Sequence, residues 1–354
     1  MLFFSVLMLG VSFNPKKVQA VQVPDIPVSV EPVYPDIQKE TSSEYFNFSV
    51  KPGDVVPTNL KLVNTSDKSV VLRIQPVPAT TTPTGDIDYS PHKGTVDGSL
   101  KYNFAKLGPT AEKITLKPKE TRIIDQKVSL QPDMKFKGMI LGGFYIWSPS
   151  VNASAQKAAI KRHKTGVYNT FGMYIGVTMH VGDDSSVFPD FRLRTVKPSI
   201  QGAEPVVLAN LQNFKPQAVT NKSMTIKAKV YHRGGQSVVK ETGNLKFSFA
   251  PNSNTDIPIS WGKSRMAPGK YTLKMTAKTG LRTWHFTRNF TITPQQSAAA
   301  NKLLPKTRSY LWLWILLVAV VVLLAIASMA YLYRRGINKG RNQTGGRSHS
   351  HRHR

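Results

Sequence analysis

Residues capable of acid–base or metal chemistry are scattered along this sequence. It contains no cysteine, and its histidines before the C-terminal tail stand singly, without metal-ligand spacing: His92, His163, His180, His232 and His285. Asp86 and Asp88, beside Tyr89, come closest to a paired-carboxylate site. Such a Gly-Asp-Ile-Asp-Tyr segment is more typical of a turn that leads into a strand. We therefore expect no enzymatic activity, no cofactor and no bound metal.

Aromatic side chains are better candidates for ligand contact. Their rings stack on sugars or anchor a partner chain, since they contribute large contact areas at low entropic cost. The candidate ligand-binding residues, with one neighbouring carboxylate included, are Tyr45, Phe46, Asp88, Tyr89, Tyr145 and Trp147. Core packing is the competing interpretation for half of them.

Hydrophobic segments lie near both ends of the chain. Residues 1–13 are almost wholly apolar and Val18-Gln19-Ala20 suits a signal peptidase, which predicts a signal peptide over residues 1–20. The basic residues that usually precede such a stretch are missing, so an uncleaved anchor or an internal start at Met1 stays open. Residues 310–333 contain no charge and are long enough to cross a bilayer core of about 30 Å as a helix.

Charge predicts the orientation of that helix. Residues 334–354 contain seven basic residues and no acidic one, so we expect a cytoplasmic tail and extracellular N-terminal domains on a single-pass membrane protein. The absence of cysteine in an exported protein favours a Gram-positive surface.

The whole chain is basic, with a net charge of +28 and a pI near 10.2. Three interpretations stay open: attraction to anionic wall polymers such as teichoic acids, steering toward an acidic protein partner, or a generally cationic solvated surface. Nucleic acid is not an expected partner, because export removes the chain from it.

The region between the hydrophobic segments alternates with period two, as in Met173, Ile175, Val177, Met179 and Val181. We predict an all-β fold of two immunoglobulin-like sandwiches in tandem, over residues 25–150 and 166–293, followed by a linker over 294–309. The stretch 148–166 reads as a linker or long loop. Alternatively, residues 169–181 pair with 139–147 and complete the first sandwich, which moves the boundary to about 183.

Motifs along both predicted domains follow a recognisable order. In the first are Tyr45-Phe46-Asn47-Phe48-Ser49-Val50, Lys51-Pro52-Gly53, Gly85-Asp86-Ile87-Asp88-Tyr89-Ser90 and Phe136-Lys137-Gly138-Met139. In the second are Gly172-Met173-Tyr174, Leu211-Gln212-Asn213, Ala250-Pro251-Asn252-Ser253 and Pro268-Gly269-Lys270-Tyr271. This order closely resembles the WxL-interacting protein family of Gram-positive bacteria, with its N-terminal peptidoglycan-binding domain and its host-binding domain. Phe249 departs from the family, which often has Met there.

The resemblance implies a membrane-anchored surface protein that holds or cooperates with secreted WxL-domain proteins at the peptidoglycan. It also implies contact between the second domain and host extracellular-matrix proteins. Another function is compatible with the residues themselves: a structural or chaperone-like subunit of a surface complex, acting by strand pairing without glycan binding.

Overall fold

The computed structural model describes residues 26–39, 44–92, 94–163, 172–304 and 311–343. The predicted signal peptide and the end of the basic tail lie outside these residues. The chain divides into a strand-rich unit up to Leu303 and a second unit from Leu304, which contains helix α4 (Leu311–Gln343).

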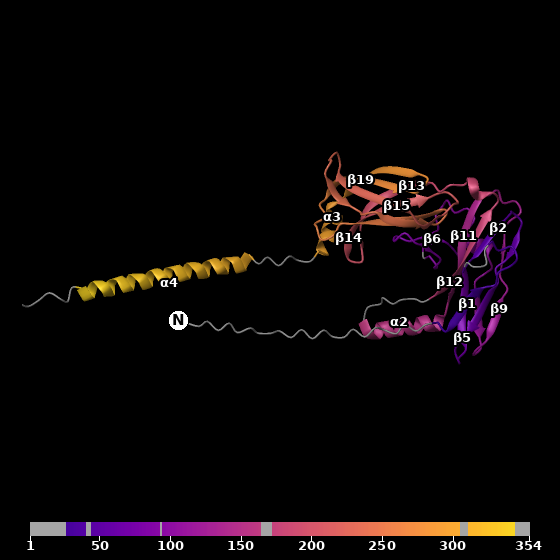
Figure 1. Cartoon of the computed structure of the whole chain (residues 1–354), viewed down its shortest axis with the longest axis horizontal. Helices are drawn as coiled ribbons and strands as arrows, with labels where there is room; N and C mark the ends of the chain where they lie inside the picture. The colour runs from indigo at the N-terminus through magenta and orange to yellow at the C-terminus, as the bar shows by residue number, and fades with distance from the viewer. Residues whose placement is uncertain (1–25, 40–43, 93, 164–171, 305–310, 344–354) are drawn as a thin grey trace, which may run out of the picture. The chain divides into compact units, whose positions relative to one another are not determined.

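The first sandwich packs two layers of strands around one core (Figure 1). One layer has the strand order β2-β12-β11-β5-β8, and the other contains β1-β4-β9 and the pair β10-β3. The strands of the first layer are β2 (Phe46–Val50), β5 (Val70–Pro78), β8 (Glu112–Leu116), β11 (Gly138–Trp147) and β12 (Met173–Val181). Those of the second are β1 (Val28–Pro32), β3 (Val55–Pro57), β4 (Leu60–Asn64), β9 (Thr121–Ile124) and β10 (Lys127–Ser129). Alternating apolar side chains from both layers, such as Leu62 and Leu72, fill the interior.

Strand β12 belongs to the first sandwich. It pairs antiparallel with β11 from Gly138↔Val181 to Ile146↔Met173, and it lies parallel to β2. This pairing is the one expected under the alternative interpretation, in which the first sandwich extends to about residue 183. Residues 149–163, expected as a loop, instead form helix α2 (Pro149–His163), in line with the high helix propensity of an alanine-rich segment.

The second sandwich has a three-stranded layer, β13-β14-β18, and a five-stranded layer in which β16-β15-β19-β20 are joined by β17 on β15. Its strands are β13 (Phe191–Gln201), β14 (Glu204–Asn213), β15 (Val219–His232), β16 (Val238–Glu241), β17 (Leu245–Phe249), β18 (Ser253–Ser260), β19 (Gly269–Lys278) and β20 (Thr283–Ile292). A short 3₁₀ turn, Asp184–Ser186, precedes them. Trp261, Tyr271 and Phe249 are fully buried in its core.

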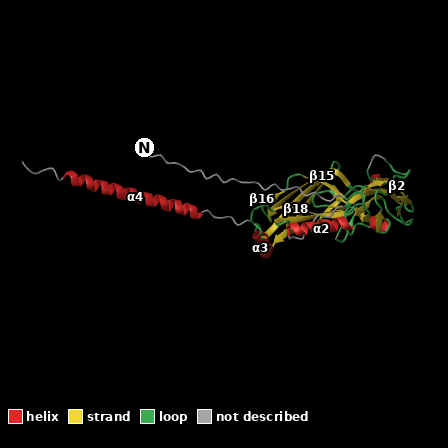
Figure 2. Cartoon of the chain, turned by 90° about the horizontal axis from the view of Figure 1, so that it is seen from below, coloured by secondary structure: helices red, strands yellow, loops and turns green. Residues whose placement is uncertain are grey.

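Helix α3 (Pro294–Lys302) occupies most of the segment expected as a linker (Figure 2). Thr293 and Gln296 form a reciprocal capping box, and Pro294 takes a first-turn position that requires no backbone N–H. Ser297 and Ala300 are buried, and Asn301 bonds to the backbone of Met266. This part of the segment expected as a linker thus forms a capped helix that packs against the second sandwich.

Helix α4 contains the candidate membrane span, Leu311–Arg335, with a mean hydropathy of 2.9 and no buried residue. Its apolar residues point outward in every direction, which fits a helix surrounded by lipid. The predicted fold class, two β-sandwiches followed by one C-terminal apolar helix, is confirmed.

Candidate ligand-binding site

Two adjacent glycines in β11 allow aromatic rings to pack closely on both faces of the first sandwich's larger sheet. A Cβ on Gly142 would lie 2.3 Å from the Phe104 ring, which enters the core from the short helix α1 (Phe104–Leu107). A Cβ on Gly143 would lie 3.2 Å from the Tyr89 ring on the opposite, outer face. The glycine pair is therefore explained by close packing.

An outer-face aromatic patch is built around this point. Tyr89, which follows strand β7 (Ile87–Asp88), stacks on Tyr174 with ring centroids 5.1 Å apart. Tyr174 lies directly opposite Tyr145 in the β11–β12 ladder, and Tyr145 packs on Trp147 at 5.4 Å. Tyr45 comes next to them, with its Cβ beside Gly176. The patch consists of Tyr45, Tyr89, Tyr145, Trp147 and Tyr174.

The rings of the patch differ in how much of their surface is exposed to solvent. Tyr174 is 56% exposed and Tyr45 40%, whereas Tyr89, Tyr145 and Trp147 are half-buried. Burial, followed by the proximity of Tyr174 and Tyr45, raises the pKa of Tyr89 well above its usual range. Burial and then Asp88 raise the pKa of Tyr145. Both hydroxyls therefore stay protonated, able to donate hydrogen bonds, across the physiological pH range.

Polar side chains border the patch on β5. Gln75 lies opposite Tyr145 and Arg73 opposite Trp147, so both share the outer face with the rings. Rings flanked by an amide and a guanidinium can stack on the apolar face of a sugar while donors reach its oxygens. This arrangement suits a glycan better than a small apolar molecule.

The six predicted site residues meet different outcomes. Tyr45, Tyr89, Tyr145 and Trp147 gather on one face, and Asp88 lies beside them, where it accepts hydrogen bonds from the backbone and hydroxyl of Ser90. Phe46 is fully buried between Tyr34 and Phe48, so its prediction as a contact residue was wrong. Tyr174 was missed, although alternation puts it on the solvent side of its strand.

Asp86 and Asp88 do not form a paired-carboxylate site. Asp86 forms an ion pair of 2.7 Å with Lys222 of the second sandwich, and hydrogen bonds from Lys222 and Thr84 lower its pKa. Asp88 is bound to Ser90 instead. Within the described ranges, no three His, Asp or Glu side chains come close enough to hold a metal ion.

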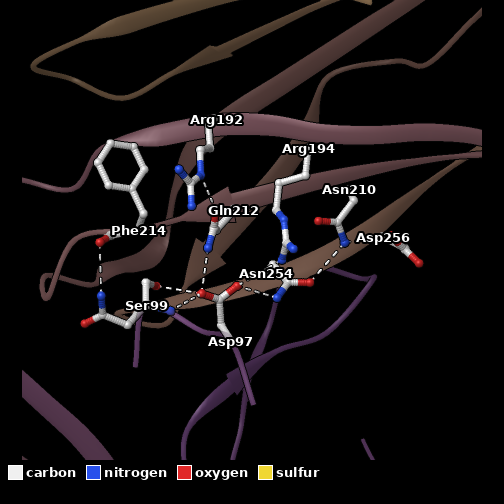
Figure 3. A network of polar contacts seen from close by, with 10 residues as sticks. Asp97, Ser99, Arg192, Arg194, Asn210, Gln212, Phe214, Asn254 and Asp256 are labelled. Carbon is white, nitrogen blue, oxygen red and sulfur yellow. Dashed lines mark hydrogen bonds and ion pairs between the residues drawn. The ribbon is translucent and has the colours of Figure 1, made fainter. Parts of the chain in front are cut away.

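A polar network joins the two sandwiches (Figure 3). Asp97, from the first, accepts hydrogen bonds from the Gln212 amide at 2.6 Å and the Asn254 amide at 2.5 Å, both on the second. Ser99 adds its backbone N–H and hydroxyl, and Arg194 approaches at 3.4 Å. Burial opposes ionisation of Asp97 most strongly, but the bonds from Ser99, Asn254 and Gln212 together outweigh it, and the pKa of Asp97 is lowered.

Strand β6 (Thr80–Thr81) makes a second connection. The Thr81 hydroxyl accepts a bond from the Ala250 backbone and lies 2.7 Å from the Ser253 hydroxyl, while Ser248 donates to the Gly85 carbonyl. The motifs Leu211-Gln212-Asn213 and Ala250-Pro251-Asn252-Ser253 thus serve the contact between the sandwiches, a role that their sequence alone did not indicate.

Comparison with known proteins identifies the chain. Residues 28–148 match the family described as WxL Interacting Protein, peptidoglycan binding domain, and residues 162–302 match WxL Interacting Protein, host binding domain. The chain belongs to the WxL-interacting protein family. The resemblance noted in its motifs is confirmed, and the two domain matches support a surface binding role for this WxL-interacting protein.

Solved structures add little to that assignment. A chain of a chaperone–tip adhesin complex of CFA/I fimbriae is 7% identical to the WxL-interacting protein, with a TM-score of 0.26, covering 74% of this chain and 97% of the other. A chain of the CsuC–CsuE chaperone–tip adhesion subunit complex of Acinetobacter baumannii is 10% identical, with a TM-score of 0.27 and coverage of 68% and 93%. These scores are too low to support an argument. No curated protein matches the chain.

Proposed function

We propose that this WxL-interacting protein is a membrane-anchored, non-enzymatic binding protein that holds secreted WxL-domain proteins at the peptidoglycan and contacts host matrix ligands. The outer-face aromatic patch carries the proposal, because four of its five rings lie within the residues matched as peptidoglycan-binding and Tyr174 joins them through the β11–β12 pairing. The patch offers stacked, half-exposed rings beside polar donors. The WxL-domain partner is suggested by the family name.

The anchor in this proposal is helix α4, oriented with its basic end in the cytoplasm. Arg334 and Arg335 follow the apolar stretch directly, and positive charge is retained on the cytoplasmic side of such spans. Both sandwiches would then face the wall, where a peptidoglycan-binding domain can meet its ligand.

Sedimentation with purified peptidoglycan tests the first domain. Full-length protein in detergent micelles is mixed with insoluble sacculi, and a variant carrying Tyr145→Ala and Trp147→Ala is compared with the parent. We expect at least about tenfold weaker retention, because two stacking contacts are removed. The matched control is Phe188→Ala, which removes a ring that is 56% exposed outside the patch. Equal retention of the double variant and the parent would remove the basis of the proposal.

A structural subunit that acts by strand pairing is the second candidate. Strand β8 is an outer strand of the five-stranded sheet, and an edge offers backbone groups to a partner strand. This function predicts that Pro substitutions in β8 abolish capture of a WxL-domain protein while the patch variant captures it normally. Loss of capture in the patch variant alone would exclude this candidate.

A further inference from the structure

The outer face of the second sandwich's larger sheet carries a regular array of lysines and threonines. Its lysines are Lys227, Lys229, Lys246, Lys270, Lys274 and Lys278, and its threonines are Thr225, Thr272, Thr276, Thr283, Thr287 and Thr291. All are exposed or half-exposed. We call this surface the Lys–Thr face.

Strand register arranges these side chains in rows across the sheet. In one row Lys246, Thr225, Lys278 and Thr283 follow one another on four strands, and in another Lys229 lies opposite Lys274, with Thr287 beyond it. Rows on one face repeat every two residues, about 6.8 Å, and neighbouring strands lie about 4.8 Å apart. The face therefore presents ammonium groups and hydroxyls in rows, together with Tyr231, His285 and Asn289.

The positive charge of this face is poorly compensated. Strands β15, β16, β17, β19 and β20 contain one acidic residue, Glu241, which lies 3.5 Å from Lys229. Within the described part of the chain, Lys227, Lys270, Lys274 and Lys278 take part in no ion pair, although Lys274 lies over the Tyr231 ring. Like charges placed directly opposite, as at Lys229 and Lys274, destabilise a sheet. A surface with mixed positive and negative charges would be equally soluble. The array of lysines is therefore better explained by an anionic ligand.

A hollow on this face indicates where such a ligand would lie. It has a volume of about 500 Å³, and Thr225, Lys227, Thr276 and Lys278 are among the residues that line it. The carbon atoms of these side chains form most of its wall, and their hydroxyl and ammonium groups are available to a ligand bound there. Ammonium groups donate up to three hydrogen bonds to oxyanion oxygens, and threonine hydroxyls donate or accept with sugar hydroxyls. None of the described residues that line the hollow is aromatic, so charge and hydrogen bonding would dominate over stacking.

We propose that the Lys–Thr face binds a linear sulfated polysaccharide. A pendant sulfate ester has three terminal oxygens that can accept hydrogen bonds from threonine hydroxyls and lysine ammonium groups. A phosphodiester within a polymer backbone has two, and the polymer continues on both sides of it. The inference deepens the host-contact part of the proposed function and rests on it, because residues 162–302 match a host-binding domain. The peptidoglycan site on the first sandwich is independent of it.

The test uses full-length protein in detergent micelles and immobilised heparin as the sulfated probe. A variant with Lys227→Gln, Lys274→Gln and Lys278→Gln should bind at least about tenfold more weakly and elute at lower salt. The charge-matched control replaces the exposed Lys51, Lys127 and Lys135 of the first sandwich with Gln and should bind within about twofold of the parent. Thr276→Val, which keeps the charge and the shape, should weaken binding by about two- to fivefold.

Two further probes separate the alternatives. If the protein recognises the sulfate esters, desulfated heparin and poly(glycerol phosphate) should each bind at least about tenfold more weakly than heparin. The proposal is overturned if poly(glycerol phosphate) binds as tightly as heparin, if both lysine variants lose binding equally, or if heparin is not bound. Peptidoglycan sedimentation of the same variants should be unchanged, so failure here is distinguishable from failure of the first-domain site.

Discussion

At the scale of single residues, a buried carboxylate has a structural task in this protein. Among the described residues, Asp97 is the one buried acidic side chain, and its carboxylate is surrounded by amide, hydroxyl and guanidinium donors. Buried charge is tolerated only when it is hydrogen-bonded. Asp97 thus fixes the contact between Gln212 and Asn254 of one sandwich and the 97–99 loop of the other.

Replacing Asp97 with Asn should loosen that contact. The amide keeps the shape but sets an NH₂ group against the donors of Gln212 or Asn254, so we expect a loss of about 2–3 kcal/mol in the free energy of unfolding. Denaturant titration followed by tryptophan fluorescence measures it. Asp67→Asn, which disturbs a salt bridge at a side chain that is 90% exposed, should change stability by less than about 0.5 kcal/mol. Similar values for the two variants would contradict the role of Asp97.

Asp97 also predicts a pH dependence. Its pKa is lower in the folded chain than the value of about 3.9 expected when unfolded, so its stabilisation is complete above that value and is lost as the pH falls through the folded pKa. We expect the stability difference between the parent and Asp97→Asn to be constant above about pH 5 and to shrink below about pH 4. Unfolding titrations across this range provide the measurement, and a difference that ignores pH would argue against a charged Asp97.

At the scale of elements, the glycine pair in β11 determines how closely the rings of the aromatic patch pack on the sheet. A methyl group on Gly143 would lie 2.7 Å from the Ile175 carbonyl oxygen and 3.2 Å from Tyr89, and the backbone atom has little freedom to move. Gly143→Ala should therefore cost about 1–3 kcal/mol and displace Tyr89 from its place against Tyr174. The midpoint temperature of thermal unfolding and the fraction of protein retained on peptidoglycan should both fall. Gly243→Ala, which has open space around it, should leave both unchanged.

Period-two alternation predicted strands such as residues 173–181, because side-chain direction in a strand is a local property. Alternation puts neighbouring residues on opposite faces of a strand but leaves open which face is buried, so it did not show that Phe46 faces the core. Tyr89 reaches the patch from outside the sheet, so its position depends on pairing and loop geometry. Helix α3 was missed although Thr293, Pro294 and Gln296 spell a capping signal.

At the scale of the whole molecule, the cysteine-free sequence allows a clean test of the proposed orientation. A single Ser237→Cys on the second sandwich should react with a membrane-impermeant maleimide on intact wall-stripped cells. Asn338→Cys, after the apolar stretch of α4, should react only once the membrane is permeabilised. The reversed pattern would place the sandwiches in the cytoplasm and contradict the surface role.

The sequence left open three interpretations of the positive charge, and the fold adds where part of that charge lies. Six lysines of the second sandwich fall on one sheet face, while the patch on the first is aromatic. Net charge is a sum over the chain and carries no information on clustering, which arises only when strands β15, β19 and β20 are brought into register.

The place of β12 between β2 and β11 affects the order in which the protein can assemble. In the proposed orientation the chain is exported N-terminus first, so β2 and β11 would be available long before β12, with α2 intervening. Until Val181 has emerged, β2 lacks its neighbour and the apolar side chains of Val177 and Met179 are missing from the core. A fragment cut at residue 148, where the peptidoglycan-binding match ends, would carry the same gap permanently and should aggregate through its open sheet edges.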